Sequence, residues 1–380
     1  MQRFFIHGML LSLISLSACS KDVTQDEDML IINQYLDIPQ NTYNYSTPQL
    51  PSFYSNQFIR IQDNSPSFNP VTDWGATLGR VLFYDKQLSI DESISCASCH
   101  QQALGFTDSL QFSRGVNGQT THRHSMALAN ATFYMNGRFF WDERAATLED
   151  QVLIPIQDPV EMAMDLDLLN ERLVNTPYYP ILFRKAFGDE EISNSKIAQA
   201  LAQFVRSMVS YQSKFDQGRA QVSNIQDDFP NFTTQENLGK NIFVNNNQVN
   251  CFGCHNTEAF ITDNPRNNGL TSSNPDVGIS IHTNNSSDDG KFKAPSLKNV
   301  ALRKHFMHDG SLSSLDEVIE FYNTGIRINP NLDPHLLNFN SGLPNKMNLS
   351  IAERNALKAF LETLTDEAFI TDKKFSDPFF

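Results

Sequence analysis

The chain has 380 residues, enough for two domains of ordinary size, and its composition of 40% hydrophobic and 19% charged residues is that of a globular protein. The formal net charge of −14 argues against binding to nucleic acid or to an anionic lipid surface. Such acidity suits a basic soluble partner, and it is also a common way of keeping a protein soluble, so both explanations stay open.

The N-terminal residues predict an export signal. Arg3 precedes an apolar run at residues 9–16, which is too short to cross a bilayer as a permanent helix. The small residues before Cys19 look like a bacterial lipoprotein signal, in which this cysteine is acylated and becomes the first mature residue. An ordinary signal peptide with an incidental cysteine is the alternative. We therefore expect a signal over residues 1–18, a lipid anchor at Cys19 and a periplasmic location.

Residues 19–72 are rich in Asn, Ser, Gln and Pro, which indicates a tether followed by an irregular arm on the surface. Regular structure is expected from residues 74–85, where Leu78 and Leu82 lie four residues apart on one face of a helix.

Two short motifs dominate the rest of the chain: CASCH at residues 96–100 and CFGCH at residues 251–255. Two cysteines three apart, followed at once by histidine, form the attachment pattern of c-type haem, in which the thiols bond to the vinyl groups and the imidazole reaches the iron. A zinc knuckle or a redox dithiol is the alternative, but the pairs lie 155 residues apart (251 − 96) and each has its own histidine. The sequence thus predicts two covalently bound haem c groups, attached through Cys96, Cys99, Cys251 and Cys254.

An internal similarity accompanies the two motifs. The sequence LGRVLF at residues 78–83 precedes the first motif, and LGKNIF at residues 238–243 precedes the second. A chance match of two unrelated helices is the alternative, but it does not explain the matching Phe and basic residue. We predict two cytochrome c-like haem domains from an internal duplication, at residues 73–225 and 226–380.

The pattern between and after the motifs is mostly helical. Apolar residues recur at helical spacing over residues 193–211, 314–325 and 350–364, and residues 233–236 have the form of a capping box. Residues 262–290 are polar, with little periodicity, and are expected to form a surface loop. Because no run of alternating strands is present, we predict a mainly α fold.

Four segments resemble the bacterial di-haem cytochrome c peroxidases. They are FFWDERAATLEDQ at residues 139–151, PIQDPVEM at 155–162, KAPSLKNV at 293–300 and FMHDG at 306–310. Together with the two haem motifs they extend the resemblance over roughly residues 78–364. The family also contains MauG, which uses the same scaffold to oxidise residues of a partner protein.

The resemblance implies roles for individual residues. His100 would be the proximal ligand of the peroxidatic haem and His255 that of the electron-transfer haem. Trp141 matches the family tryptophan between the haems, and Gln151 and Glu161 match the pair that lines the peroxide pocket. A carboxylate there can accept a proton from peroxide and return it, whereas an amide can only hydrogen-bond and position. The ordinary alternatives are core packing for the tryptophan and solvent exposure for the other two.

The loop at residues 113–119 departs from the family, because it lacks the histidine that closes the first iron in many relatives. We therefore expect this haem to be open without prior reduction. His122 and His124 lie slightly further on and are expected to have structural or surface roles. His124 also stands where relatives usually place a calcium-binding Asn, which weighs against the calcium ion that the resemblance implies between the domains.

The second departure is Tyr322, which stands 14 residues after His308, where peroxidases of the family usually have a Met and MauG has a Tyr. The residue also belongs to the apolar stripe of its helix, so a core role is the alternative. A buried phenol needs a partner for its oxygen, and ferric iron is an adequate one. We expect Tyr322 to ligate the second iron, which would lower its reduction potential.

These expectations make the chain a peroxidase that reduces hydrogen peroxide to water with electrons from a small cytochrome c or copper protein. Two alternatives are MauG-like oxidation of a partner protein and a non-catalytic di-haem electron carrier. For the oligomeric state, we consider a homodimer.

Overall fold

The computed structural model describes residues 27–246, 249–261 and 264–380. The predicted signal and the predicted anchor at Cys19 lie outside these described residues, so both stay predictions. None of the helices in the described ranges has the length and apolar character needed to span a membrane.

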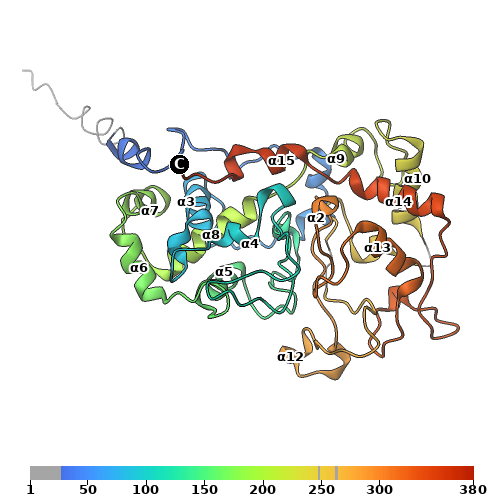
Figure 1. Ribbon diagram of the computed structural model, residues 1–380. Helices are drawn as coiled ribbons and strands as arrows, with labels where there is room; N and C mark the ends of the chain where they lie inside the picture. The colour runs from blue at the N-terminus through green and yellow to red at the C-terminus, as the bar shows by residue number, and fades with distance from the viewer. Residues whose placement is uncertain (1–26, 247–248, 262–263) are drawn as a thin grey trace, which may run out of the picture.

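The described residues form helices and irregular segments, and no strand longer than an isolated bridge occurs among them. The prediction of a mainly α fold is confirmed. Figure 1 shows the helices in two groups that lie side by side, the first half of the chain on the left and the second on the right.

The first group is built on the crossing of α3 (Asp73–Tyr84) and α8 (Asn194–Ser207). The side chains of Thr72 and Ser193 cap their first turns, because each accepts a hydrogen bond from a backbone N–H that has no partner within the helix. Around the crossing lie α4 (Cys96–Cys99), α5 (Leu148–Gln157), α6 (Leu166–Val174) and α7 (Tyr179–Phe187).

The second group is built on the crossing of α10 (Thr234–Asn245) and α14 (Ile351–Glu362), both of which begin with a capping box. The predicted box at residues 233–236 is therefore confirmed. This group also contains α11 (Cys251–Cys254), α12 (Ser280–Thr283) and α13 (Leu315–Glu320), and α13 continues into a π-helical turn over Phe321–Gly325.

A glycine allows the close helix crossing in each group. A Cβ atom on Gly79 would lie 2.0 Å from the carbonyl oxygen of Ala200, and one on Gly239 would lie 1.9 Å from that of Ala356. These are the two glycines of the repeated LG sequence, so the repeat marks the same packing contact twice. The contact is compatible with a duplication, which stays a prediction, as do the domain boundaries.

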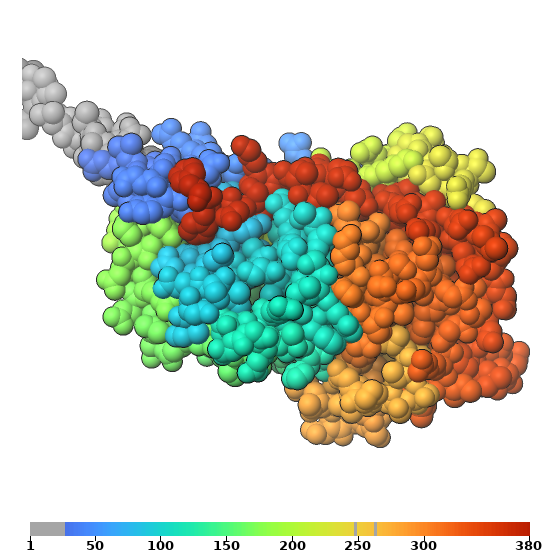
Figure 2. Space-filling model, viewed as in Figure 1, coloured from blue at the N-terminus to red at the C-terminus, as the bar shows by residue number. Residues whose placement is uncertain are grey.

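Both ends of the described chain pack on the first group. Ile32 and Leu36, from the arm that we placed on the surface, are fully buried in its core. Beside them, α15 (Glu367–Thr371) and the residues that follow return from the second group, and the hydroxyl of Tyr45 donates to the carbonyl oxygen of Lys374 at 2.5 Å. Figure 2 shows this last segment lying across one edge of both groups.

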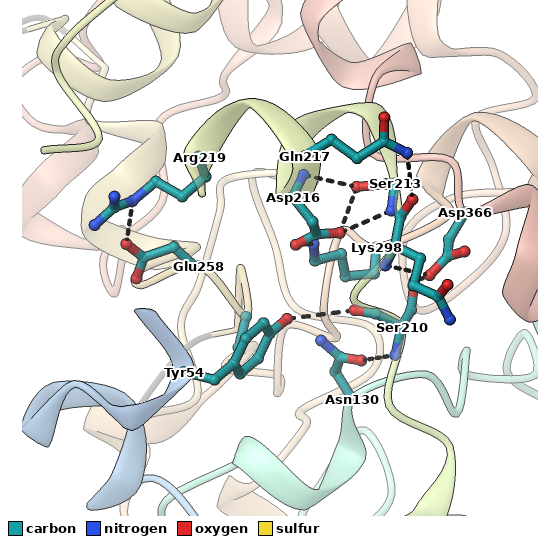
Figure 3. Close-up of polar contacts among 12 residues, drawn as sticks. Tyr54, Asn130, Ser210, Ser213, Asp216, Gln217, Arg219, Glu258, Lys298 and Asp366 are labelled. Carbon is teal, nitrogen blue, oxygen red and sulfur yellow. Dashed lines mark hydrogen bonds and ion pairs between the residues drawn. The ribbon is translucent and has the colours of Figure 1, made fainter. Parts of the chain in front are cut away.

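A buried polar network joins the two groups where the chain passes between them, near α9 (Lys214–Arg219) (Figure 3). The Lys298 ammonium donates to the Asp216 carboxylate at 2.5 Å, and both side chains are almost completely buried. In the same region, Asn130 Oδ1 accepts a hydrogen bond from the backbone N–H of Ser210 at 2.7 Å. Such contacts fix the position of one group relative to the other, because a buried charge or amide that loses its partner is costly.

Candidate functional site

The first haem motif forms the single turn α4 with His100 as its C-terminal cap. Nδ1 of His100 lies 3.1 Å from the carbonyl oxygen of Phe106, and the backbone of Met126 also lies beside the buried ring. Burial lowers the pKa of His100 and so favours the neutral imidazole. A neutral imidazole whose Nδ1 is held by a backbone carbonyl fits a haem ligand, because that contact directs Nε2 toward the metal.

The second motif repeats this arrangement in α11 with His255 as the cap. Nδ1 of His255 is buried near the carbonyl oxygen of Phe260, but no hydrogen bond satisfies it. Burial lowers the pKa of His255 to about 4, so its imidazole is neutral at pH 7. No disulfide joins the cysteines in the described part of the chain. Both motifs therefore fit covalent haem c.

Four of the predicted site residues, Trp141 among them, line one cavity of about 550 Å³ beside the first motif. His100, Gln151 and Glu161 all line it. Gln151 projects from α5, and Glu161 lies in the turn that follows this helix, where its backbone N–H donates to the carbonyl oxygen of Asp158 at 3.0 Å. The structure thus places the predicted peroxide pair on the walls of the cavity that His100 enters.

The environment of Glu161 favours its protonated form. Its pKa is raised from 4.5 to about 7, mainly by burial and also by the nearby Asp158 carboxylate, while the Arg144 guanidinium opposes the shift. The described residues give this carboxylate no hydrogen-bond partner. A carboxyl group that titrates near neutral pH inside a cavity is suited to general acid–base chemistry.

Trp141 lies on the walls of two cavities, the one beside His100 and a second one beside His255. It stands in a tight hairpin that is closed by backbone hydrogen bonds between Phe139 and Ala145. Its indole Nε1–H donates to the carbonyl oxygen of His124 at 2.7 Å, which fixes the ring. Trp141 therefore lies beside both cavities, and its role between two haems stays a prediction.

Tyr322 lies in the second cavity together with His255. The residue belongs to the π-helical turn after α13, and turns of this kind often occur at functional sites. Its hydroxyl accepts only a long contact of 3.5 Å from Nδ2 of Asn268, and burial raises its pKa far above the usual range. The expected ligation of the second iron stays a prediction that this position supports.

Pro155 is the counterpart of Tyr322 in the first group of helices. The two hairpins begin at Phe139 and Phe306, 167 residues apart (306 − 139), and the same offset leads from Pro155 to Tyr322 (322 − 155). Pro155 also lines the first cavity. Because proline has no side-chain donor or acceptor, this position offers no atom to a metal.

The other histidines near the first cavity are differently placed. The side chain of His122 is exposed, whereas His124 is buried. Nδ1 of His124 lies 3.1 Å from two backbone carbonyl oxygens, and Nε2 lies 3.2 Å from the hydroxyl of Thr107. One group of three His, Cys or carboxylate side chains within reach of a single ion occurs among the described residues, and it joins Cys254, Asp333 and His335. It does not include His124, and a calcium ion between the domains stays an untested prediction.

The sequence did not indicate two further features of the site. Lys293 lines both cavities, whereas the sequence indicates only that it belongs to the segment at residues 293–300 that resembles the family. Arg123 forms ion pairs of 2.7 Å with Asp142 in the Trp141 hairpin and with Asp276 from the second group. Both features depend on residues far apart in the chain, and no local pattern signals them.

Comparison with known proteins identifies the family. The model of the di-haem cytochrome c peroxidase family matches residues 74–223 and 233–335. MauG, a methylamine utilization protein of Methylorubrum extorquens, is 35% identical over 305 residues, which is 80% of this chain and 81% of that protein. The cytochrome c551 peroxidase of Nitrosomonas europaea is 32% identical over 249 residues, 64% of this chain and 71% of that protein.

A solved structure supports the same relationship. The crystal structure of a MauG-like protein associated with microbial copper homeostasis superposes with a TM-score of 0.73 at 29% identity, covering 88% of this chain and 99% of that one. The family carries two haem c groups, for which the two motifs described above provide the thiols and the imidazoles. The chain belongs to the di-haem cytochrome c peroxidase family, which includes MauG, and is a haem-dependent oxidoreductase.

Proposed function

We propose that this protein reduces hydrogen peroxide to water in the periplasm, with electrons from a small cytochrome c or copper protein. The main support is that His100, Gln151 and Glu161 line one cavity, and that Trp141 lines both this cavity and the one beside His255. When bound, the two haems would supply the iron at which peroxide reacts and a store for a second electron.

The protein's own groups would move the protons. Reduction of one peroxide to two waters consumes two electrons and two protons, and one proton must pass from one peroxide oxygen to the other as their bond breaks. Glu161 can accept and return this proton, because near neutral pH both of its protonation states are populated. The amide of Gln151 can hold peroxide in place by a hydrogen bond.

The net charge and the N-terminal sequence indicate which partner and which membrane attachment the protein would have. The net charge of −14 favours encounter with a basic donor protein over a long range. A lipid at Cys19 would keep the enzyme at a membrane surface. A homodimer is compatible with this arrangement and forms no part of the mechanism.

Tyr322 supports a second candidate function, the oxidation of residues of a partner protein with peroxide as the oxidant. This residue faces the second cavity where peroxidases of the family usually have Met, and relatives named MauG share 35% and 32% identity with this chain. A tyrosinate ligand stabilises higher oxidation states of iron and so favours stored oxidising equivalents over rapid electron uptake.

The substitution Glu161→Gln separates both enzymes from a non-catalytic electron carrier. It keeps the size of the side chain and removes its proton chemistry. The exposed Glu171 on α6 provides the matched control, Glu171→Gln. We expect Glu161→Gln to slow peroxide consumption by 10²-fold or more with both haems still attached, and the control to be unaffected. Equal rates in all three proteins would reject the proposed role of Glu161.

Steady-state turnover separates the two enzymes. With reduced small cytochromes or copper proteins as donors, a peroxidase should consume peroxide continuously at roughly 1–10³ s⁻¹, the usual range of turnover numbers for enzymes. A rate far below this range with every donor, together with peroxide-dependent modification of a partner protein, would favour the MauG-like activity.

A further inference from the structure

Lys293 is a buried lysine on the walls of both cavities. Its side chain is 3% exposed, and it enters the site from the segment that follows the polar loop of the second group. Few lysines are buried in proteins without an ion pair, because removing an ammonium from water is costly. The position of this one between two redox sites therefore calls for an explanation.

The contacts of Lys293 tie it to the Trp141 hairpin. Its backbone N–H donates to the carbonyl oxygen of Trp141 at 2.8 Å, and its Nζ donates to the carbonyl oxygen of Arg138 at 3.2 Å. Nζ also lies 3.8 Å from the ring centre of Tyr134 and 4.4 Å from that of Phe139, distances at which an aromatic ring attracts a cation. The lysine thus holds both ends of the segment that carries the indole.

Within the described ranges, no carboxylate forms an ion pair with the ammonium of Lys293. The nearest acidic influence is Glu143, whose carboxylate is engaged by the hydroxyl of Tyr134 and by the amide of Asn136. Burial lowers the pKa of Lys293 to about 7, and Glu143 opposes this shift. The other charged or titratable groups nearby include Arg138, Asp142 and Arg144 on the hairpin, and Arg123, His124, His308 and Arg303 on the cavity walls.

We propose that Lys293 is a positioning residue for electron exchange between the two haems, which holds the Trp141 hairpin and places one exchangeable positive charge between the cavities. This inference rests on the proposed function, in which one haem would store an electron for the other and Trp141 lies beside both cavities. A positive charge there favours the reduced state of either haem. Release of the Lys293 proton to solvent near pH 7 would offset the positive charge that a bound haem gains when it is oxidised, so the total buried charge would stay constant.

Potentiometric titration of both haems in the purified holoprotein, between pH 6 and pH 8.5, tests this role. Lys293→Met keeps the length of the side chain and removes the charge, whereas Lys293→Arg keeps the charge at every pH. The matched control is Lys240→Met, because Lys240 is also buried, donates to the backbone carbonyls of Ile225 and Asp227, and lines neither cavity.

At pH 6 we expect Lys293→Met to weaken electron binding about tenfold at one or both haems, which for one electron is about 59 mV. At pH 8.5, where the native lysine is neutral, Lys293→Met should have the same reduction potentials as the native protein. Lys293→Arg, which is still charged at this pH, should have higher reduction potentials than both. Lys240→Met should behave as native throughout. If Lys293→Met does not retain both haems, Lys293→Gln takes its place.

Native potentials in Lys293→Met at pH 6, or an equal change in Lys240→Met, would overturn the inference. The titration needs no peroxide, so its outcome is independent of turnover. A protein that never reduces peroxide, yet shows the charge-dependent potentials, would refute the proposed function and keep this role of Lys293. Native-like peroxide turnover, together with reduction potentials that are the same in the Lys293 variants and the native protein, would support the proposed function and refute this role of Lys293.

Discussion

The pH dependence of the reaction with peroxide tests the proposed role of Glu161 in most detail. The pKa of this group is raised from 4.5 to about 7, and burial is the main cause. A shift of this size corresponds to about 3 kcal/mol of preference for the neutral form. A base must be ionised to accept a proton, so the second-order rate constant should follow the ionised fraction of Glu161.

The expected profile is a plateau at pH 8 and above, and about a tenfold fall by pH 6, where a group with a pKa of 7 is about one-tenth ionised. A glutamate with an ordinary pKa would give a flat profile over this range. The assay is stopped-flow absorption of the oxidised protein mixed with peroxide at each pH. The ratio of the rate constants at pH 8 and pH 6 should be about 10 for a raised pKa and about 1 for an ordinary one.

Neighbouring charges provide a second perturbation with a known sign. Asp158→Asn removes the like charge that raises the pKa of Glu161, so the fall in rate should move to lower pH. Arg144→Gln removes the opposing cation and should move it to higher pH. A profile that is flat between pH 6 and pH 8, or that persists unchanged in Glu161→Gln, would refute the reasoning.

Three further predictions concern the second haem and the fold. Tyr322→Phe should abolish the low-spin electron paramagnetic resonance signal of the second haem if the phenol is its ligand, and an unchanged signal would mean that Tyr322 is only core. Gly79→Ala should lower the unfolding free energy by about 1–3 kcal/mol in guanidinium titrations, because its Cβ would meet the carbonyl oxygen of Ala200 at 2.0 Å, and native stability would contradict that crossing. Lys298→Met should lower the free energy of unfolding by about 3–5 kcal/mol, because it leaves the Asp216 carboxylate buried and unpaired. Adding Asp216→Asn should recover part of this loss. A Lys298→Met variant with native stability would be inconsistent with the buried pair.

The stability of the protein should also report the burial of Glu161. Because the pKa of this acid is higher in the folded protein than in the unfolded chain, the stability that it contributes is complete below pH 4.5 and is lost as the pH rises through about 7. Glu161→Gln has no such loss. It should therefore be more stable than the native protein at pH 8, by up to about 3 kcal/mol, and similar at pH 4.

Features set by short stretches of sequence could be predicted. The capping box that begins at Thr233 is confirmed, because it joins residues only three positions apart. The repeated LG sequence marked the helices in which Gly79 and Gly239 allow the two close crossings. The mainly helical class follows from the same local periodicity.

Features set by distant contacts could not be predicted. Ile32 and Leu36 belong to a polar, proline-rich segment, and their burial depends on residues far away in the chain, among them Phe379, which forms a bridge with Leu36. The position of Lys293 between the cavities depends on a hydrogen bond to Trp141, which is 152 residues earlier (293 − 141). The residue types alone gave no sign of either, because a lysine is usually exposed.

The most direct test of the central claim is the absorption of the Soret band after peroxide is added to the fully oxidised holoprotein. The arrangement of His100, Glu161 and Pro155 around one cavity predicts a rapid change in this band without prior reduction, and a slow change or none in Glu161→Gln. A Soret band that peroxide leaves untouched in the native protein, both oxidised and reduced, would contradict the account of an open first haem that reacts with peroxide.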